Sequence, residues 1–286
     1  MSFKGKHGPL LIAEIGGNHE GDIDYAHELL DLAIMSKADV IKFQIYNPES
    51  LVNRNVDLDR FNHFKKFTLK PKDHISLAKK CIDNNKIYLA SVWDIDSIKW
   101  INEFSRYYKV GSGDLTAYQI IKELTKTKKP LILSTGLSKV TEVNDTIEFI
   151  KSQDSIYKKK DRIALLQCTS NYPIPESESN LSVMKYFKNK YNFPVGYSDH
   201  TEGLDSLILA AVLGAEILEF HFTDNKLNRT FRDHSVSLTK DDVELLVEKI
   251  VKNKSIIGNP VKSPTFSEIK SKHTFSFRRS LYAKKD

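Results

Sequence analysis

The chain has 286 residues, enough for one large domain or two small ones, and its 40% hydrophobic and 28% charged residues are ordinary for a globular protein. No apolar run is long enough to span a bilayer, and the first residues lack the apolar core of a signal peptide. Two cysteines, Cys81 and Cys168, provide no disulfide framework. We therefore expect a cytoplasmic protein without a membrane partner.

The formal net charge of +6 has two possible meanings. A nucleic-acid-binding surface would gather its cations in one stripe, whereas these lysines are scattered along helix-like segments. The densest run, Lys158–Lys160, is expected in a solvated loop. A basic pocket for an anionic small molecule fits the charge better, and no nucleic-acid partner is expected.

Apolar runs of strand length alternate with amphipathic stretches of helix length along the whole chain. The expected strands are Leu10–Ile15, Val40–Ile45, Ile87–Trp93, Tyr107–Val110, Pro130–Ser134, Ile163–Cys168, Pro194–Tyr197 and Ile217–Phe222. The expected helices are Tyr25–Ser36, Pro71–Asn84, Ile95–Phe104, Tyr118–Thr125, Thr141–Ser152, Leu181–Asn189, Gly203–Leu213 and Thr239–Asn253. Eight nearly continuous apolar strands, each followed by a helix, predict an α/β fold, the (β/α)₈ TIM barrel, over residues 1–255. A doubly wound open sheet fits less well, because no Gly-x-Gly-x-x-Gly motif occurs.

Two connections and the chain's end depart from this alternation. Asn47–Thr68 is long and carries two arginines, a histidine and aromatic residues, which is typical of a lid. Asn225–Arg232 is polar and is a second candidate to cover a site. From Ile256 to Asp286 the pattern becomes that of an extended linker or tail.

The last two expected strands each close on a histidine, His200 and His221. A strand, a helix and a strand make parallel neighbours, so both imidazoles reach the same rim of the sheet. Asp199 and Glu219 adjoin them, and this combination indicates a divalent metal such as Mn²⁺, Fe²⁺ or Zn²⁺. The alternative, two hydrogen-bonded core histidines, stays open.

Two lysines, Lys42 and Lys109, lie inside apolar strands. A charge at such a position needs an anionic partner or loses its proton, so structural ion pairs with Glu14, Asp114 or Glu219 are one interpretation. The lysines also precede glycine- and hydroxyl-rich strand ends at 111–113 and 134–136. Backbone N–H groups and hydroxyls of that kind favour binding of a phosphate or a carboxylate.

Seven motifs at the strand ends resemble, in order, those of the sialic acid synthase family, which includes N-acetylneuraminate synthase and its legionaminic and pseudaminic acid relatives. They are Ile12–His19 (IAEIGGNH), Ile41–Gln44 (IKFQ), Lys109–Asp114 (KVGSGD), Leu133–Gly136 (LSTG), Gln167–Pro173 (QCTSNYP), Gly196–Thr201 (GYSDHT) and Leu218–Thr223 (LEFHFT). The resemblance runs from about Leu10 to Asp286 without a large gap. One strand departs from it: many relatives have Ser-Thr-Pro-Phe-Asp where this chain has Ala90–Asp94 (ASVWD), and Ser91 receives no role.

The resemblance implies an enzyme that condenses phosphoenolpyruvate with an N-acylated hexosamine, such as N-acetylmannosamine, to a nine-carbon 2-keto sugar acid and phosphate. It assigns the metal, usually Mn²⁺, to His200 and His221. It assigns phosphoenolpyruvate to Lys42, Lys109, Ser112, Ser134, Ser170 and Ser198, and the sugar to Gln44, Tyr172 and Asp233. It places Glu14 near the reacting carbons and Glu219 facing the site. A metal on the sugar aldehyde acts as a Lewis acid, and Glu14 or Asp233 manages the proton transfers.

Family members continue beyond a segment like 278–286 into a small antifreeze-like domain, which in a homodimer reaches over the partner's sugar site. The chain stops at Asp286, so we expect an incomplete sugar site and leave the homodimer open. One alternative is a related barrel synthase that takes a different aldehyde or a sugar phosphate. Its second basic cluster would have to come from the loop arginines Arg54, Arg60, Arg229 and Arg232. The other alternative is a non-catalytic barrel that binds carbohydrates or anions.

Overall fold

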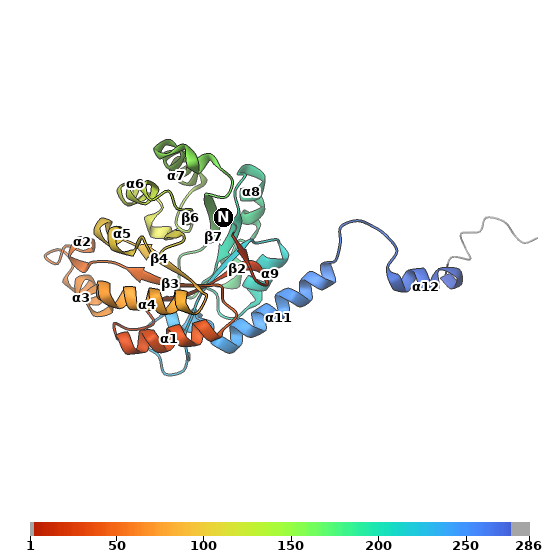
Figure 1. Cartoon of the computed structure of the whole chain (residues 1–286), viewed down its shortest axis with the longest axis horizontal. Coiled ribbons are helices and arrows are strands. Elements are labelled where there is room, and N and C mark those ends of the chain that lie inside the picture. Colours follow the sequence, from red (N-terminus) through yellow and green to blue (C-terminus); the bar gives the residue numbers. More distant parts are fainter. Residues whose placement is uncertain (1–2, 276–286) are drawn as a thin grey trace, which may run out of the picture.

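The computed structural model describes the backbone of residues 3–275 and the side chains of residues 3–271. Within these residues a nine-stranded sheet begins with an antiparallel pair, β1 on β2, and continues as parallel strands that close into a barrel because β2 also pairs with β9 (Figure 1). The strands are β1 (Lys4–Gly5), β2 (Gly8–Gly16), β3 (Val40–Ile45), β4 (Ile87–Val92), β5 (Tyr108–Val110), β6 (Leu131–Ser134), β7 (Ile163–Cys168), β8 (Val195–Ser198) and β9 (Ile217–His221). The predicted (β/α)₈ barrel is confirmed.

Helices follow the barrel strands at the predicted places, within a few residues at each end. They are α1 (Ile23–Met35), α4 (Pro71–Asp83), α5 (Ile95–Ile101), α6 (Tyr118–Lys126), α7 (Val140–Gln153), α8 (Ser182–Lys190), α9 (Asp205–Val212) and α11 (Lys240–Ile257). Local chemistry sets their starts. The Asp22 carboxylate accepts from the first N–H groups of α1, and Thr239 and Asp242 cap α11 reciprocally.

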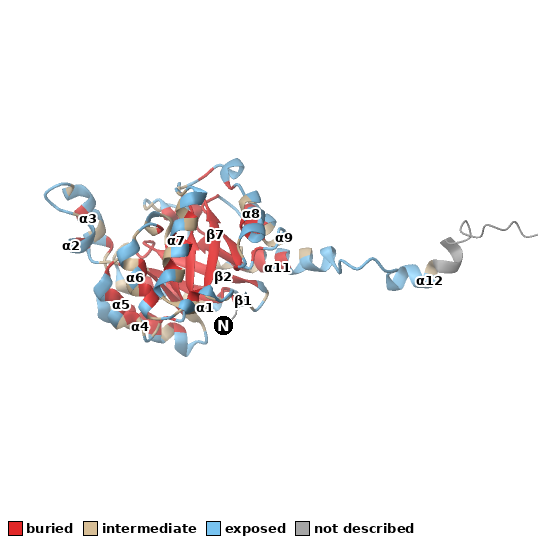
Figure 2. Cartoon of the chain, turned by 90° about the horizontal axis from the view of Figure 1, so that it is seen from above, coloured by how far each residue is buried: buried red, intermediate tan, exposed pale blue. Residues whose placement is uncertain are grey.

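One further helix and several short helical turns lie in the connections. The helix is α3 (Leu58–Phe67), and the turns are α2 (Pro48–Leu51), α10 (Asp233–Val236), η1 (Ser112–Asp114), η2 (Ser155–Lys158) and η3 (Glu176–Glu178). The segment 47–68, predicted as a loop, therefore contains two helices, each capped by a side chain that precedes it, Asn47 and Asp57. Figure 2 shows α2 and α3 projecting from one edge of the barrel.

The segment after the barrel was predicted to be extended, but part of it is helical. Helix α11 runs on to Ile257, and α12 (Phe266–Phe275) stands away from the barrel at the end of an irregular stretch (Figure 1). Phe266 and Ile269 of α12 are exposed. The predicted tail from 276 to 286 lies outside the described residues.

The barrel strands pack on both faces, as the buried strands in Figure 2 show. Their outward side chains join the helices in a large apolar layer, whereas their inward side chains form a second, smaller cluster that fills the amino-terminal end of the barrel. This inner cluster, here called the apolar plug, consists of Phe3, Leu10, Ile12, Val40, Leu89, Tyr107, Ile132, Ala164, Leu166 and Ile217. Among the described helices, none has the length and apolar character needed to cross a bilayer.

Candidate active site

The inward face of the barrel changes from apolar to polar within two residues on strand after strand. Side chains alternate along a strand, so the residue two positions beyond an inward apolar one also points inward. On β2 Ile12 is followed by Glu14, and on β3 Val40 is followed by Lys42 and then Gln44. The same step leads on the other strands to Ser91, Lys109, Ser134, Cys168 and Glu219.

These polar residues line one cavity of about 570 Å³ at the carboxyl ends of the strands. Every residue to which the family resemblance assigned a role lies in its lining: Glu14, Lys42, Gln44, Lys109, Ser112, Ser134, Ser170, Tyr172, Ser198, His200, Glu219, His221 and Asp233. The structure thus brings together residues from strands that are up to about 200 positions apart in the chain. In barrel enzymes this end carries the active site.

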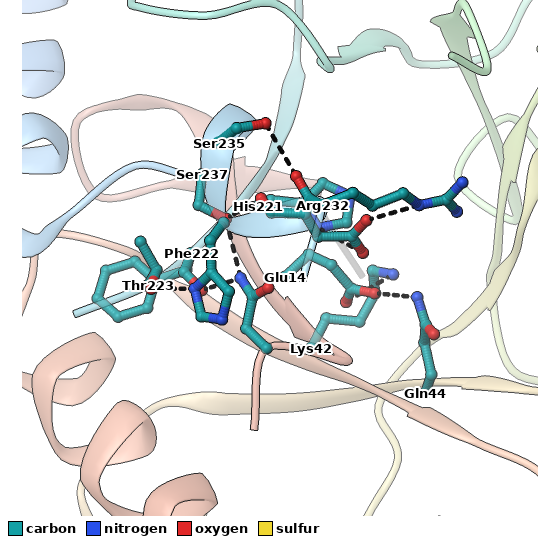
Figure 3. Close-up of polar contacts among 12 residues, drawn as sticks. Glu14, Lys42, Gln44, His221, Phe222, Thr223, Arg232, Ser235 and Ser237 are labelled. Atoms are coloured by element: carbon teal, nitrogen blue, oxygen red, sulfur yellow. Dashed lines mark hydrogen bonds and ion pairs between the residues drawn. The ribbon is translucent and has the colours of Figure 1, made fainter. Parts of the chain in front are cut away.

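An ionic network occupies the floor of the cavity. Lys42 Nζ lies 2.7 Å from Glu14 Oε2 and 3.8 Å from Glu219 Oε1. Lys109 Nζ lies 3.5 Å from the same Glu219 oxygen and donates to Ser134 Oγ at 2.7 Å. The structural ion pairs considered for the two lysines are therefore present for Glu14 and Glu219. Figure 3 shows the Glu14 carboxylate between Lys42 and the Gln44 amide, which donates to it at 2.9 Å.

Burial and pairing shift these groups in different directions. Burial would lower the pKa of Lys42, but Glu14 and Glu219 outweigh it and raise that pKa. Burial would raise the pKa of Glu219, but Lys109 and Lys42 outweigh it and lower that pKa. Burial prevails at the other two groups, where it lowers the pKa of Lys109 and raises that of Glu14. Glu14 is thus the carboxyl of the pair better suited to hold a proton.

A cradle of hydroxyls lies beside Lys109, around the backbone of Gly136. The Gly136 N–H donates to Ser112 Oγ at 3.1 Å. A Cβ at this position would overlap Ser170 Oγ and come within 2.8 Å of Ser112 Oγ, so only glycine leaves these hydroxyls room. Hydroxyls and a lysine around exposed backbone are a suitable environment for an anion. Ser198 takes a different partner and donates to Glu219 Oε1 at 3.2 Å.

The two predicted histidines lie together, with ring centroids 5.4 Å apart. His200 Nδ1 is 2.7 Å from the carbonyl oxygen of Thr169, which can only accept, so Nδ1 carries the proton and Nε2 is left free. His221 Nδ1 is buried without a hydrogen-bond partner. Burial lowers the pKa of both rings, that of His221 well below its usual value, so both are neutral near pH 7.

Two neutral imidazoles with unshared nitrogen electron pairs fit a divalent metal, and His221 Nδ1 makes no hydrogen bond that would occupy its electron pair. Within the described residues, no group of three or more His, Cys, Asp or Glu side chains is arranged to hold a metal. Asp199, expected beside the histidines, instead accepts from Tyr197 Oη and from the N–H of Thr201, both at 2.9 Å. The protein would therefore supply two ligands and leave the others to solvent or substrate.

Asp233 lines the cavity next to His221. Its Oδ2 lies 3.7 Å from His221 Nδ1, and Arg232 Nε donates to its Oδ1 at 3.2 Å. Burial raises the pKa of this carboxyl, although Arg232 opposes the shift. Asn18 fixes the backbone here, because its amide donates to the Phe222 carbonyl and to Ser237 Oγ, which in turn donates to the Asp233 carbonyl.

Tyr172 covers the histidines. Its ring centroid lies 4.0 Å from that of His200 and 5.5 Å from that of His221. The Arg232 guanidinium stacks 4.7 Å above the same ring. Of the other loop arginines, Arg60 lines the cavity, whereas Arg229 is held by Asp224 and Arg54 is exposed and outside the lining.

Sequence reasoning missed several residues of the cavity. Ser91, which received no role, accepts from Lys42 Nζ at 3.4 Å. Tyr46 and Trp93 line the cavity mouth with Phe64 of α3. Tyr46 and Trp93 could have been found from the sequence. Each lies two residues after an inward-facing residue, Gln44 or Ser91, and residues two apart on a strand face the same side. Nothing in the sequence alone would have brought Phe64 to the same place.

The fold and the cavity define a (β/α)₈ barrel with a cationic, hydroxyl-rich site at the carboxyl ends of its strands. Residues 29–262 match the NeuB family, so the chain belongs to that family. It is 33% identical to an N,N'-diacetyllegionaminic acid synthase of Campylobacter jejuni over 97% of this chain and 85% of that protein. It is 29% identical to an N-acetylneuraminate-9-phosphate synthase of Mus musculus over 90% of this chain and 74% of that protein.

A solved structure agrees with these sequence relationships. The N-acetylneuraminic acid (sialic acid) synthetase of Leptospira borgpetersenii, crystallised in complex with citrate, superposes with a TM-score of 0.85 at 29% identity, over 97% of this chain and 94% of that one. The predicted resemblance to the sialic acid synthase family is confirmed.

Proposed function

We propose that the protein condenses phosphoenolpyruvate with an N-acylated hexosamine of the N-acetylmannosamine type, giving a nine-carbon 2-keto sugar acid and phosphate. It is then a transferase that forms a carbon–carbon bond. The observation that carries the proposal is that Lys42, Lys109 and the hydroxyl cradle line the same cavity as His200 and His221. The acid synthases among the relatives support it.

Phosphoenolpyruvate carries a phosphate and a carboxylate, and the floor of the cavity offers a cation for each. Lys109, with Ser112, Ser134 and Ser170 around Gly136, suits the phosphate. Lys42 suits the carboxylate, and Ser198 supplies a further hydroxyl. Before the ligand binds, Glu14 and Glu219 neutralise the two lysines, so no buried cation is unpaired. An arriving anion would take over part of that pairing.

The acceptor sugar then lies between this floor and the cavity mouth, in contact with Gln44, Tyr172 and Asp233. His200 and His221 would hold a divalent metal, for which Mn²⁺ is our first candidate. When bound, this ion supplies Lewis-acid polarisation of the acceptor's carbonyl oxygen. The Tyr172 ring over the histidines limits access of water from that side.

The reaction requires three bond changes that the chain's own residues can assist. C3 of phosphoenolpyruvate bonds to the aldehyde carbon, water adds to C2, and the C–O bond to phosphate breaks. The aldehyde oxygen gains a proton, and the attacking water loses one as it adds. The proton that remains on the new C2 hydroxyl leaves with the departing phosphate as the keto group forms. Glu14 and Asp233 are the candidates for these transfers, because both carboxyls line the cavity and burial raises the pKa of each, which favours the protonated form that can donate.

The test is phosphate release from phosphoenolpyruvate with Mn²⁺ and a panel of N-acylated hexosamines. Release with an unphosphorylated sugar is expected, together with its loss in His221→Ala. His27→Ala is the matched control, since His27 lies on α1 and outside the cavity. Release only with a sugar phosphate would replace the proposed acceptor. Binding of phosphoenolpyruvate without release for any sugar would support a non-catalytic barrel and overturn the proposal.

A further inference from the structure

Three aromatic rings form a wall at the mouth of the cavity. Tyr46 and Trp93 stack with centroids 4.9 Å apart and ring planes inclined by 14°. Phe64 meets both edge-on, at 5.2 Å from Tyr46 and 6.1 Å from Trp93. All three line the same cavity as the lysines and histidines, and Leu51 and Val52 of the projecting segment extend the apolar lining. We call Tyr46, Phe64 and Trp93 the aromatic wall.

The position of the wall follows from strand geometry. Lys42, Gln44 and Tyr46 share one inward phase, and so do Ser91 and Trp93 on the neighbouring strand. Gln44 pairs with Ser91, and the Trp93 N–H donates to the Ile45 carbonyl at 2.9 Å, so the pairing continues to the wall. Tyr46 lies four positions beyond Lys42, which at about 3.3 Å per residue is about 13 Å along the strand direction. The wall thus lies well above the floor, with Gln44 between them.

The chemistry of the wall differs from that of the floor. Aromatic faces bury methyl groups, C–H edges and acyl groups, and they provide no counter-charge for an anion. The indole N–H of Trp93 is buried and has no hydrogen-bond partner among the described residues. A bound group with a carbonyl oxygen would relieve that unmet donor once it reached the wall.

The loop arginines do not convert this region into a phosphate site. Arg229 is neutralised by Asp224, and Arg232 is shared between Asp233 and the face of Tyr172. Arg60 remains, on the exposed surface of α3. Tight binding of a phosphate usually takes several converging donors, which one exposed guanidinium does not provide.

We propose that the aromatic wall is the subsite for the end of the acceptor sugar remote from its aldehyde. At this end of the sugar the wall favours an apolar group over a phosphate. The apolar group is either an acyl group or a methyl that replaces the hydroxymethyl. This inference rests on the proposed function, because it concerns the second substrate of the same site. Trp93 contacts both other rings of the wall and carries the unmet indole N–H, so it is the principal specificity-determining residue.

The test compares three probes that differ at one carbon: N-acetylmannosamine, its 6-deoxy analogue and its 6-phosphate. Phosphate release gives kcat/KM for each. The 6-deoxy analogue is expected to exceed the 6-phosphate at least about tenfold, since one group in an apolar pocket is worth about that much. Trp93→Leu should lower kcat/KM for the 6-deoxy analogue about tenfold through a higher KM, and should reduce the ratio of kcat/KM between the 6-deoxy analogue and the 6-phosphate. Trp93→Phe keeps an aromatic ring and should retain most of that ratio.

Trp100→Phe is the matched control, since the chain has two tryptophans and Trp100 packs beside His74, outside the cavity lining. This variant should keep all three kcat/KM values. It also leaves Trp93 as the only indole, so saturating 6-deoxy sugar in the presence of phosphoenolpyruvate should change its fluorescence. Circular dichroism and a thermal melt establish that Trp93→Leu is folded.

The outcomes separate this inference from the proposed function. If phosphate is released but Trp93→Leu lowers kcat/KM equally for all three sugars, the inference is wrong and the proposed function stands. If the 6-phosphate is the best substrate of the wild type, the inference is wrong and the sugar-phosphate variant of the proposed function stands. If no sugar releases phosphate although calorimetry detects phosphoenolpyruvate, the proposed function fails first. An unchanged Trp93 fluorescence at saturating sugar would also contradict the inference.

Discussion

The two ends of the barrel interior are built from the same strands and have opposite chemistry. At the amino-terminal end the apolar plug is buried and ends in the stacked rings of Phe3 and Tyr107, 5.2 Å apart. At the carboxyl end two lysines and two glutamates are linked by three ion pairs of 2.7 to 3.8 Å. The inward phase does not change between them; only the residue type does.

This difference shows how the fold divides its tasks. Burial of the plug stabilises the closed barrel through apolar area removed from water. The charged end gains little stability, because the cost of desolvating ions roughly offsets their mutual attraction. We infer that the plug holds the strands in register and that the charged end is retained for binding and chemistry.

The largest effect is expected from removing a charge at the carboxyl end. Lys42→Met should lower phosphate release from phosphoenolpyruvate about a thousandfold, or about 4 kcal/mol of transition-state stabilisation, because it removes a ligand cation and leaves Glu14 unpaired. Steady-state kinetics on the folded variant measure this. Lys99→Met, which removes an exposed lysine paired with Asp96 on α5, should be without effect. More than one-tenth of wild-type activity in Lys42→Met would contradict the division of tasks.

A substitution in the plug should have the reverse consequence. Ile12→Ala removes a fully buried side chain and should lower the free energy of unfolding by about 3 kcal/mol through the cavity it leaves. Urea denaturation measures the loss, and activity at low temperature should remain near wild type. Ile256→Ala is the control, since Ile256 is exposed. A large drop in kcat without a loss of stability would mean that the plug also acts in catalysis.

The apolar layer between the strands and the helices should tolerate a buried charge, such as a protonated histidine, less well than the floor of the cavity does. His74 lies buried beside Phe43, Tyr88 and Trp100, and burial lowers its pKa to about 3. Between about pH 3 and 6.5 the unfolded chain binds a proton here that the folded chain does not, so stability falls as pH falls through this window.

The prediction for this layer is a smaller acid sensitivity in His74→Gln. At pH 5 the histidine should account for about 2 kcal/mol of the stability lost relative to neutral pH, and the variant should lack that part. Urea denaturation at pH 7.5 and pH 5 measures the difference. His19, whose pKa burial lowers to about 4, contributes in the same direction and remains in both proteins. Equal losses in the two proteins would show that His74 takes up its proton while folded.

The smallest effect is expected at the hydroxyl cradle. Gly136→Ala places a Cβ against Ser170 Oγ and Ser112 Oγ, so the hydroxyls must shift from the anion they surround. Affinity for phosphoenolpyruvate should fall about tenfold, or about 1.4 kcal/mol, with the melting temperature little changed. Calorimetry measures the affinity, and Ser152→Ala is the control because Ser152 is exposed on α7, outside the cavity lining. Unchanged affinity would remove Gly136 from the anion site.

Much of the site could be predicted because it depends on strand phase. Lys42, Gln44 and Glu219 stand in unbroken apolar strands, and the period of two places them on the inner face once a barrel is assumed. Asp199 was misplaced by the same reasoning. It follows β8 next to His200, but Tyr197 and Thr201 bind its carboxylate and hold it away from the cavity.

The residues that were missed depend on contacts between distant segments. Helix α3 has only two buried residues, Phe61 and Phe67, and its sequence resembles a polar loop. Its Phe64 meets Tyr46 and Trp93 only because the projecting segment folds back over the strand ends. No local pattern encodes that return.

The sequence by itself determined the alternation of strands and helices, the inward phase of the two lysines and the pairing of two histidines on adjacent strand ends. These features follow from periodicity, which acts over a few residues. Only the tertiary structure decided that Lys42 pairs with Glu14, that Lys109 meets Ser134, and that His221 keeps an unpartnered nitrogen. Closure of the barrel also brings β2 against β9 and sets Glu14 opposite His221, because contacts between residues about 200 positions apart arise only when all the strands between them are in register.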